Sequence, residues 1–183
     1  MAVKEKILLN VCCGNCATHC VNALREEGFE PVMYFYNPNI YPEEEFKKRY
    51  SDVLKLADIT GAGNIENPPY EVSEWKKRCG SLAGEPEGGR RCAECFRLKM
   101  EKTAEKTKEL GFEIFASTLT ISPHKNAALI NRLGNEAAKN HGVKYYESNF
   151  KKKNGFKKSV ELSKKYGFYR QKYCGCVYSM NDR

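Results

Sequence analysis

A short apolar run and the cysteine-rich turn after it decide how this chain folds: Lys6-Ile7-Leu8-Leu9-Asn10-Val11-Cys12-Cys13-Gly14-Asn15-Cys16. The run from Lys6 to Val11 has the length and composition of a buried strand. A helix is expected from about Cys16 to Glu27, and a second strand over 31–36. A strand, a helix and a strand of these lengths predict two parallel strands joined by a crossover helix.

The rest of the chain continues this alternation. Helices are expected over 43–60, 71–81, 92–110, 122–140 and 159–166, and strands over 112–117 and 143–146. The helix at 122–140 is expected to begin with Ser122 as N-cap and Pro123 in its first position. We therefore interpret residues 1–183 as a single α/β domain with a mostly parallel sheet flanked by helices, because this length suffices to bury a core.

The composition is that of a soluble globular protein, with 41% hydrophobic and 30% charged residues. The apolar run near the start is too short to span a membrane and is followed by no small-residue cleavage site. These features predict a cytoplasmic protein without a membrane partner. Clustered cysteines in that compartment bind metal or do redox chemistry more often than they form disulfides.

The positive charge of this chain is concentrated near its end. Residues 151–183 hold ten Lys/Arg against two acidic residues, whereas the first 150 residues hold twenty-one of each sign. A basic segment of this kind suits a polyanion such as nucleic acid. From charge alone, an ordinary lysine-rich surface explains the segment equally well.

Seven of the nine cysteines fall into three clusters: Cys12, Cys13 and Cys16; Cys92 and Cys95; Cys174 and Cys176. Thiolates select zinc, copper(I) or iron–sulfur clusters over hard cations. The first cluster follows a strand at the sheet edge where α/β proteins bind ligands, and the second opens a helix, whose dipole favours thiolate. We expect the clusters to converge on one site.

Less specific interpretations of the cysteines remain open. Two Cys-x-x-Cys pairs can make a structural zinc site, but that site needs four thiolates and seven are clustered. The three cysteines beyond these four indicate a second metal, an open coordination position or a redox pair. Cys20 is expected to be a small buried hydrophobe and Cys79 a packing residue. The sequence has no phosphate-binding loop, dinucleotide fingerprint or Gly-x-Ser-x-Gly elbow.

Several segments, taken in order along nearly the whole chain, carry a family resemblance. They are residues 12–16, 36–40, Trp75, 88–96, 118–126, 149–152 and 169–179. Together they closely resemble the cobalamin-independent, QueH type of epoxyqueuosine reductase. The resemblance implies a fold similar to the nucleotide α-hydrolase-like group. It also implies reductive removal of the epoxide oxygen from epoxyqueuosine at the tRNA wobble position, the last step of queuosine biosynthesis.

The resemblance further implies a 4Fe–4S cluster and a second metal ion, iron being expected. Because a cluster delivers electrons singly, an external electron donor must refill it. We assign all seven clustered cysteines to the metals. We divide them into Cys13, Cys92, Cys95 and Cys176 for the cluster, and Cys12, Cys16 and Cys174 for the second ion.

The remaining site residues are assigned by residue type. Phosphate contacts are expected from Lys151, Lys152, Lys153, Lys157, Lys158, Arg170 and Lys172. Base stacking is expected from Tyr36, Trp75, Tyr169 and Tyr173, with core packing as the alternative for each. Ser122, His124 and Lys125 are the candidate proton donors.

Two other functions compete with this hypothesis. One is a non-catalytic RNA-binding module with structural zinc, which would never need iron. The other is an iron–sulfur enzyme that transfers sulfur to tRNA. Such enzymes normally require ATP, and the absence of a phosphate-binding loop counts against that function.

Overall fold

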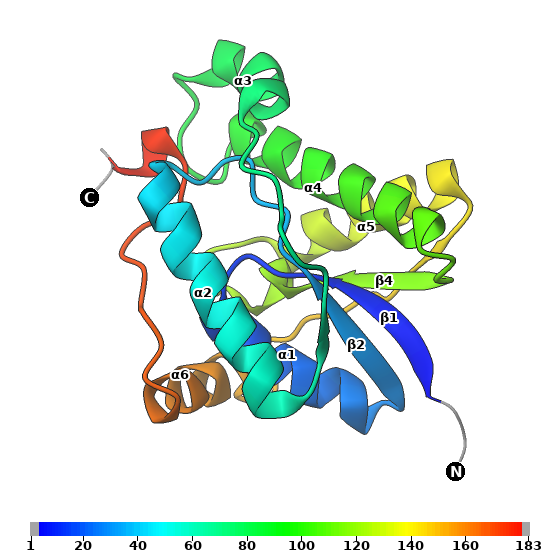
Figure 1. Ribbon diagram of the computed structural model, residues 1–183. Helices are drawn as coiled ribbons and strands as arrows, with labels where there is room; N and C mark the ends of the chain where they lie inside the picture. Colours follow the sequence, from blue (N-terminus) through cyan, green and yellow to red (C-terminus); the bar gives the residue numbers. More distant parts are fainter. Residues whose placement is uncertain (1–3, 181–183) are drawn as a thin grey trace.

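A five-stranded parallel sheet between two layers of helices forms the centre of the computed structural model, which describes residues 4–180 (Figure 1). The strand order is β3-β2-β1-β4-β5. The strands are β1 (Glu5–Asn10), β2 (Phe29–Tyr34), β3 (Gly63–Asn64), β4 (Ile114–Ser117) and β5 (Lys144–Tyr145). The predicted α/β class is confirmed, and the arrangement is consistent with a nucleotide α-hydrolase-like fold.

The central strand β1 is buried on both faces. Ile7 and Leu9 pack into the core beneath α1 (Gly14–Glu26) and α2 (Glu43–Thr60). Leu8 points the other way, into the core beneath α4 (Arg90–Glu109) and α5 (Ala127–His141). This two-sided burial is the reason that the strand is a continuous apolar run rather than an alternating one.

The last helix, α6 (Gly155–Lys165), joins the layer of α1 and α2. It buries a stripe of small residues, Gly155, Ser159 and Ser163, and the Thr18 hydroxyl of α1 lies 3.4 Å from the Ser159 carbonyl oxygen that accepts its hydrogen bond. After α6 the chain runs alongside α2 and ends near α3 (Ser73–Cys79) (Figure 1). Short 3-10 turns occur at η1 (Gly80–Leu82), η2 (Thr118–Ile121) and η3 (Val177–Met180).

The expected start of α5 was wrong. The helix begins at Ala127, where the Asn126 side-chain oxygen accepts from the Leu129 amide at 3.1 Å. Ser122 instead accepts from the His124 amide at 3.3 Å, within the preceding turn. Asn and Ser are comparable N-caps, so local propensity could not choose between the two starts.

Other differences from the sequence expectations are small. Helix α1 begins at Gly14 rather than Cys16, and β2 ends at Tyr34. Helix α6 begins at Gly155, four residues before the expected start at Ser159, and ends at Lys165. Strand β3 was not predicted, because two residues carry no recognisable periodicity. Within residues 4–180, none of the helices combines the length and the apolar composition that a membrane span requires.

Candidate metal centre and cavity

A cavity of about 270 Å³ lies at the carboxyl ends of β1 and β4. Cys12 follows β1 and Thr118 follows β4, and the Cys12 amide donates to the Thr118 hydroxyl at 3.2 Å. The helices that follow these two strands cover opposite faces of the sheet. Such a switch point leaves a crevice where open α/β sheets bind ligands.

Three thiols gather at the start of α1. The Sγ atoms of Cys12, Cys13 and Cys16 all lie within 4.8 Å of one another, and those of Cys12 and Cys13 are 3.9 Å apart. Cys13 is the N-cap of the helix, and its sulfur accepts from the Cys16 amide at 3.4 Å. It also accepts from the Gln171 amide group at 3.1 Å. The backbone of α1 thus fixes the spacing of this group, which we call the α1 thiols.

The other four clustered cysteines come from two distant segments. Cys92 and Cys95 lie in the first turns of α4, and Cys174 and Cys176 lie in the segment after α6. Cys95 and Cys176 are buried together with Trp75, Cys79 and Leu98. We call this set the α4 thiols: Cys92, Cys95, Cys174 and Cys176.

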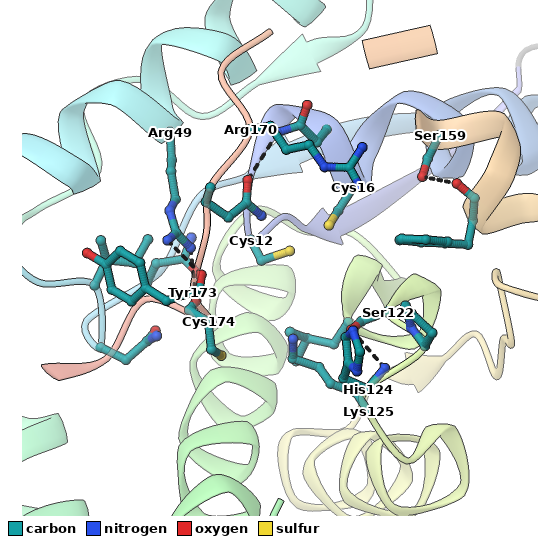
Figure 2. A pocket seen from close by; sticks show the side chains of 18 of the residues that line it. Cys12, Cys16, Arg49, Ser122, His124, Lys125, Ser159, Arg170, Tyr173 and Cys174 are labelled. Carbon is teal, nitrogen blue, oxygen red and sulfur yellow. Dashed lines mark hydrogen bonds between the residues drawn. The ribbon is translucent and has the colours of Figure 1, made fainter. Parts of the chain in front are cut away.

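The two groups of thiols meet at the cavity. Its wall includes Cys12 and Cys16 from the α1 thiols and Cys95 and Cys174 from the α4 thiols. In Figure 2, Cys12 lies between Cys16 and Cys174, and the sulfurs of Cys12 and Cys16 point toward the interior. This grouping places Cys13 beside Cys12 and Cys16, whereas the sequence-based division assigned Cys13 to the cluster with Cys92, Cys95 and Cys176.

The α1 thiols do not hold their protons equally. Hydrogen bonds from Cys13 and Cys16 lower the pKa of Cys12 well below its ordinary value. The contact with Cys12 raises the pKa of Cys13 to about 12, and contacts with Cys12 and Cys13 raise the pKa of Cys16 well above its ordinary value. One thiolate, that of Cys12, is therefore shared by two neutral neighbours.

Three basic side chains of the cavity wall favour the thiolate form of the cysteines. Lys125 favours the Cys12 thiolate, and Arg49 opposes the rise in the pKa of Cys13 that its neighbour Cys12 causes. Burial raises the pKa of Cys95 to about 11, and Lys99 opposes that rise. Because thiolate is the form that ligates metal, these cations prepare the cavity for metal binding.

The segment that carries Cys174 is fastened to α2 by buried polar groups. Arg49 donates to the carbonyl oxygens of Cys174 at 2.9 Å and Tyr173 at 3.1 Å, and pairs with Glu45 at 2.8 Å. The carboxylate of Asp52 accepts from the Tyr169 amide at 2.8 Å. Helix α2 therefore sets the position of one wall of the cavity.

Comparison with known proteins identifies the family. The protein-family model described as "Epoxyqueuosine reductase QueH" matches residues 7–182 of this chain. The chain belongs to the QueH family. Relatives named epoxyqueuosine reductase QueH from Streptococcus pyogenes serotype M1, Haemophilus influenzae and Thermotoga maritima are 42%, 39% and 35% identical to it. Each alignment covers 97% of this chain, and 71%, 73% and 91% of the respective relatives.

The geometry of this QueH-family chain suits a thiolate-bound metal centre. Two thiolates at about 2.3 Å from a tetrahedral ion are roughly 3.8 Å apart. The separation of 3.9 Å between the Cys12 and Cys13 sulfurs is close to that value. The clustered donors are all sulfur, the set that iron–sulfur clusters and soft metals require. Cys20 and Cys79 are fully buried, as expected of packing residues.

The three candidate proton donors all line the cavity, although they lie in a turn and not at a helix start. His124 is exposed, whereas Ser122 and Lys125 are half-buried. Burial would lower the pKa of Lys125, but the sulfurs of Cys174, Cys12 and Cys16 raise it above its ordinary value. Lys125 is therefore a cation at neutral pH in the metal-free protein.

The predicted RNA-contacting cations divide into two kinds. Six are exposed: Lys152, Lys153, Lys157, Lys158, Arg170 and Lys172. Of these six, only Arg170 lines the cavity. Lys151 differs, because its ammonium donates to the carbonyl oxygens of Ser122 at 3.2 Å and Lys125 at 2.6 Å. It anchors the turn of the candidate donors, which argues against the predicted phosphate contact.

Among the predicted stacking residues, only Tyr173 lines the cavity. Trp75 is 4% exposed and packs against Tyr178, so the prediction that it stacks a base is wrong for this conformation. Tyr36 packs against the cluster that contains Trp75. Tyr169 is exposed, and its hydroxyl donates to Glu45 at 2.9 Å.

Several cavity residues were missed from the sequence. Arg49 and Lys99 occupy inward positions of α2 and α4 that a simple pattern reserves for apolar residues. Lys99 follows Cys92 and Cys95 at spacings of seven and four, so the helical period places all three on one face. Phe156 was missed as well, although a phenylalanine inside a lysine-rich stretch is a detectable signal.

Proposed function

We propose that this protein is an epoxyqueuosine reductase, which converts epoxyqueuosine to queuosine at the wobble position of tRNA. The observation that supports it most is the meeting of the α1 and α4 thiols at one cavity, in a chain that the QueH model matches almost throughout. Removing an epoxide oxygen to leave an alkene and water consumes two electrons and two protons. The site must therefore supply both.

We assign the metals by the grouping of the thiols. The α4 thiols offer the four ligands of a 4Fe–4S cluster, and the α1 thiols offer three ligands to a second ion, with iron as our expectation. When bound, these metals would supply electrons one at a time and a Lewis acid for the epoxide oxygen. An external electron donor is required to restore the electrons.

The chain's own residues would supply the rest of the chemistry. Lys125 is the best placed candidate for a proton donor, because it holds its proton at Nζ beside the thiols while facing the cavity. Ser122 and His124 stay candidates for the second proton. Tyr173, with the Arg49 guanidinium carbon 5.3 Å from its ring centroid, offers an aromatic surface within the wall.

We further propose that residues 1–183 act as one α/β unit in the cytoplasm, with the basic segment 151–183 completing the metal site. Arg170, Gln171, Tyr173 and Cys174 of that segment line the cavity. The exposed lysines 152, 153, 157, 158 and 172 and Arg170 would contact the phosphates of the tRNA.

The function is tested with tRNA that carries epoxyqueuosine. The protein, prepared and reduced without oxygen, should convert the modified nucleoside to queuosine, detected by mass analysis of the digested RNA. Iron and sulfide should be present at about four or more atoms per chain, as the proposed metals require. A protein that holds only zinc after anaerobic preparation would refute the cofactor, and unchanged epoxyqueuosine would refute the reaction.

A further inference from the structure

Phe156 is an apolar side chain that stands open to solvent at the rim of the cavity. It is 36% exposed and lines the cavity together with Val160, which follows it at a spacing of four along α6. The neighbouring stripe of Gly155, Ser159 and Ser163 is buried against α1. The packing of α6 therefore turns Phe156 away from the core and toward the site.

The backbone around Phe156 is tightly constrained. Lys153 and Asn154 both have left-handed conformations, with φ of 51° and 62°. Gly155 has no room for a side chain, because a Cβ there would overlap the carbonyl oxygen of Phe150. The carbonyl of Phe156 accepts from the Ser159 hydroxyl at 2.7 Å. The backbone that carries Phe156 is therefore fixed, which reduces the ordering that a later partner has to impose.

The charges around this ring indicate the chemistry of the partner. Lys152, Lys153, Lys157 and Lys158 are all exposed within four residues of Phe156. Within residues 4–180, the one carboxylate at ion-pair distance from any of them is that of Glu161, 4.0 Å from Lys157. A flat apolar ring among exposed cations, of which only Lys157 lies at ion-pair distance from a carboxylate in the described part of the chain, matches a base with its phosphates. Single-stranded nucleic acids bind through stacking and charge together.

We propose that Phe156 is the platform on which a base of the RNA substrate stacks as its nucleotide enters the cavity. This proposal rests on the proposed function for the identity of the RNA. The contribution of Phe156 to RNA binding differs from that of the lysines, because stacking adds affinity that salt does not screen. Loss of the ring should therefore weaken binding by roughly 5-fold to 150-fold while leaving its salt dependence unchanged.

The test uses the metal-loaded protein and an anticodon stem-loop RNA with 2-aminopurine at the wobble position. Stacking on an aromatic ring changes the fluorescence of that base. Wild type, Phe156→Ala, Phe156→Leu and Phe156→Trp are compared by RNA affinity and by the fluorescence of the bound RNA. Leu110→Ala is the control, because Leu110 is equally exposed, at 36%, but lies at the other end of α4 from its cysteines.

The Ala and Leu variants should lose affinity and the fluorescence change, and the Trp variant should retain both. Phe156→Leu preserves apolar bulk, so a loss of RNA affinity in this variant reflects lost stacking rather than lost packing. A thermal melt checks that the variant is folded. Binding and fluorescence like those of Leu110→Ala would overturn the proposal, as would a lost salt dependence in Phe156→Ala. The binding result does not depend on turnover: a wild type that binds through Phe156 but leaves epoxyqueuosine unchanged would refute the reaction and not the platform.

Discussion

The cavity thiols and the basic side chains around them form a charge-matched set. Arg49, Lys125 and Lys99 favour the thiolates of Cys13, Cys12 and Cys95 respectively, and Lys125 also lies in the field of Cys174 and Cys16. Thiols in an apolar cavity would stay protonated, and thiolates without cations would repel one another. The cations relieve both effects, so this site can hold several thiolate ligands close together.

Cys12 should be the most reactive of the α1 thiols in the metal-free protein. Its pKa is lowered, so its thiolate persists as the pH falls, whereas the raised pKa of Cys16 keeps that thiol neutral. Iodoacetamide at pH 6.5, followed by peptide mass analysis, should modify Cys12 before Cys16, although both line the cavity. Equal modification of the two, or faster modification of Cys16, would contradict this distribution of protons.

Lys99→Met should weaken metal retention. Lys99 is 4% exposed, favours the Cys95 thiolate and donates to the Asn37 side-chain oxygen at 2.9 Å. Methionine keeps the volume of the side chain but removes the charge. Substituting a residue that supports a metal ligand typically lowers metal affinity by roughly 10-fold to 100-fold. Metal loss to a chelator, followed anaerobically, provides the measurement.

Lys102→Met is the matched control, because Lys102 lies on the same helix and pairs with Glu105 at 3.1 Å outside the cavity. Lys99→Arg keeps the positive charge and should retain metal nearly as well as wild type. Equal metal loss from Lys99→Met and Lys102→Met would contradict the proposed role of Lys99.

At the scale of elements, α2 and the segment after α6 depend on each other. The Arg49–Glu45 pair is buried, and Arg49 also holds the backbone next to Cys174. Removing one partner of a buried pair leaves the other charge uncompensated, which typically costs 3–5 kcal/mol. The position of Cys174 in the site is therefore controlled from a helix that carries no cysteine.

Arg49→Met should lower the free energy of unfolding by about 3 kcal/mol and loosen the segment after α6, so that trypsin cleaves faster at the already exposed Arg170 and Lys172. Lys47→Met removes an exposed pair with Glu43 on the same helix and should change that energy by less than about 1 kcal/mol. Urea denaturation and limited proteolysis measure the two effects. Similar stability and similar cleavage in the two variants would show that the segment is held by other contacts.

The elements themselves were largely predictable from the sequence. The apolar run at β1 and the amphipathic period of α2 indicated both elements close to their observed bounds. The start of α5 was not predictable, because Ser122 and Asn126 are equivalent caps until tertiary contacts choose one. The seven clustered cysteines could be selected from the sequence. Their division into the α1 and α4 thiols could not, because it depends on the path that the chain takes after α6.

At the scale of the whole molecule, the positive charge lies where the cavity opens. The lysines around the start of α6 are exposed, and Arg170 lines the cavity itself. Lys108 and Lys139 are exposed as well, but they lie near the carboxyl ends of α4 and α5. In a parallel α/β fold those helix ends are at the sheet edge opposite the site.

This contrast predicts how salt affects RNA binding. Neutralising Lys152 and Lys153 to Gln should reduce the slope of log affinity against log salt by roughly 1.4 to 1.8, because two phosphate contacts are lost. The double change Lys108→Gln and Lys139→Gln alters net charge equally and should leave the slope unchanged. Iron content should not differ between the variants. Equal slopes for the two double variants would place the RNA elsewhere.

We propose that the α1 and α4 thiols act together in one reductive site. The direct measurement is the fraction of epoxyqueuosine converted to queuosine in tRNA by anaerobically reduced protein, with Cys12→Ser and Cys95→Ser representing the two groups and Cys20→Ala as the buried-cysteine control. Wild type and Cys20→Ala should produce queuosine, and the other two variants should leave epoxyqueuosine intact. Unchanged epoxyqueuosine with wild type, or conversion by Cys12→Ser and Cys95→Ser at the rate of Cys20→Ala, would contradict the account.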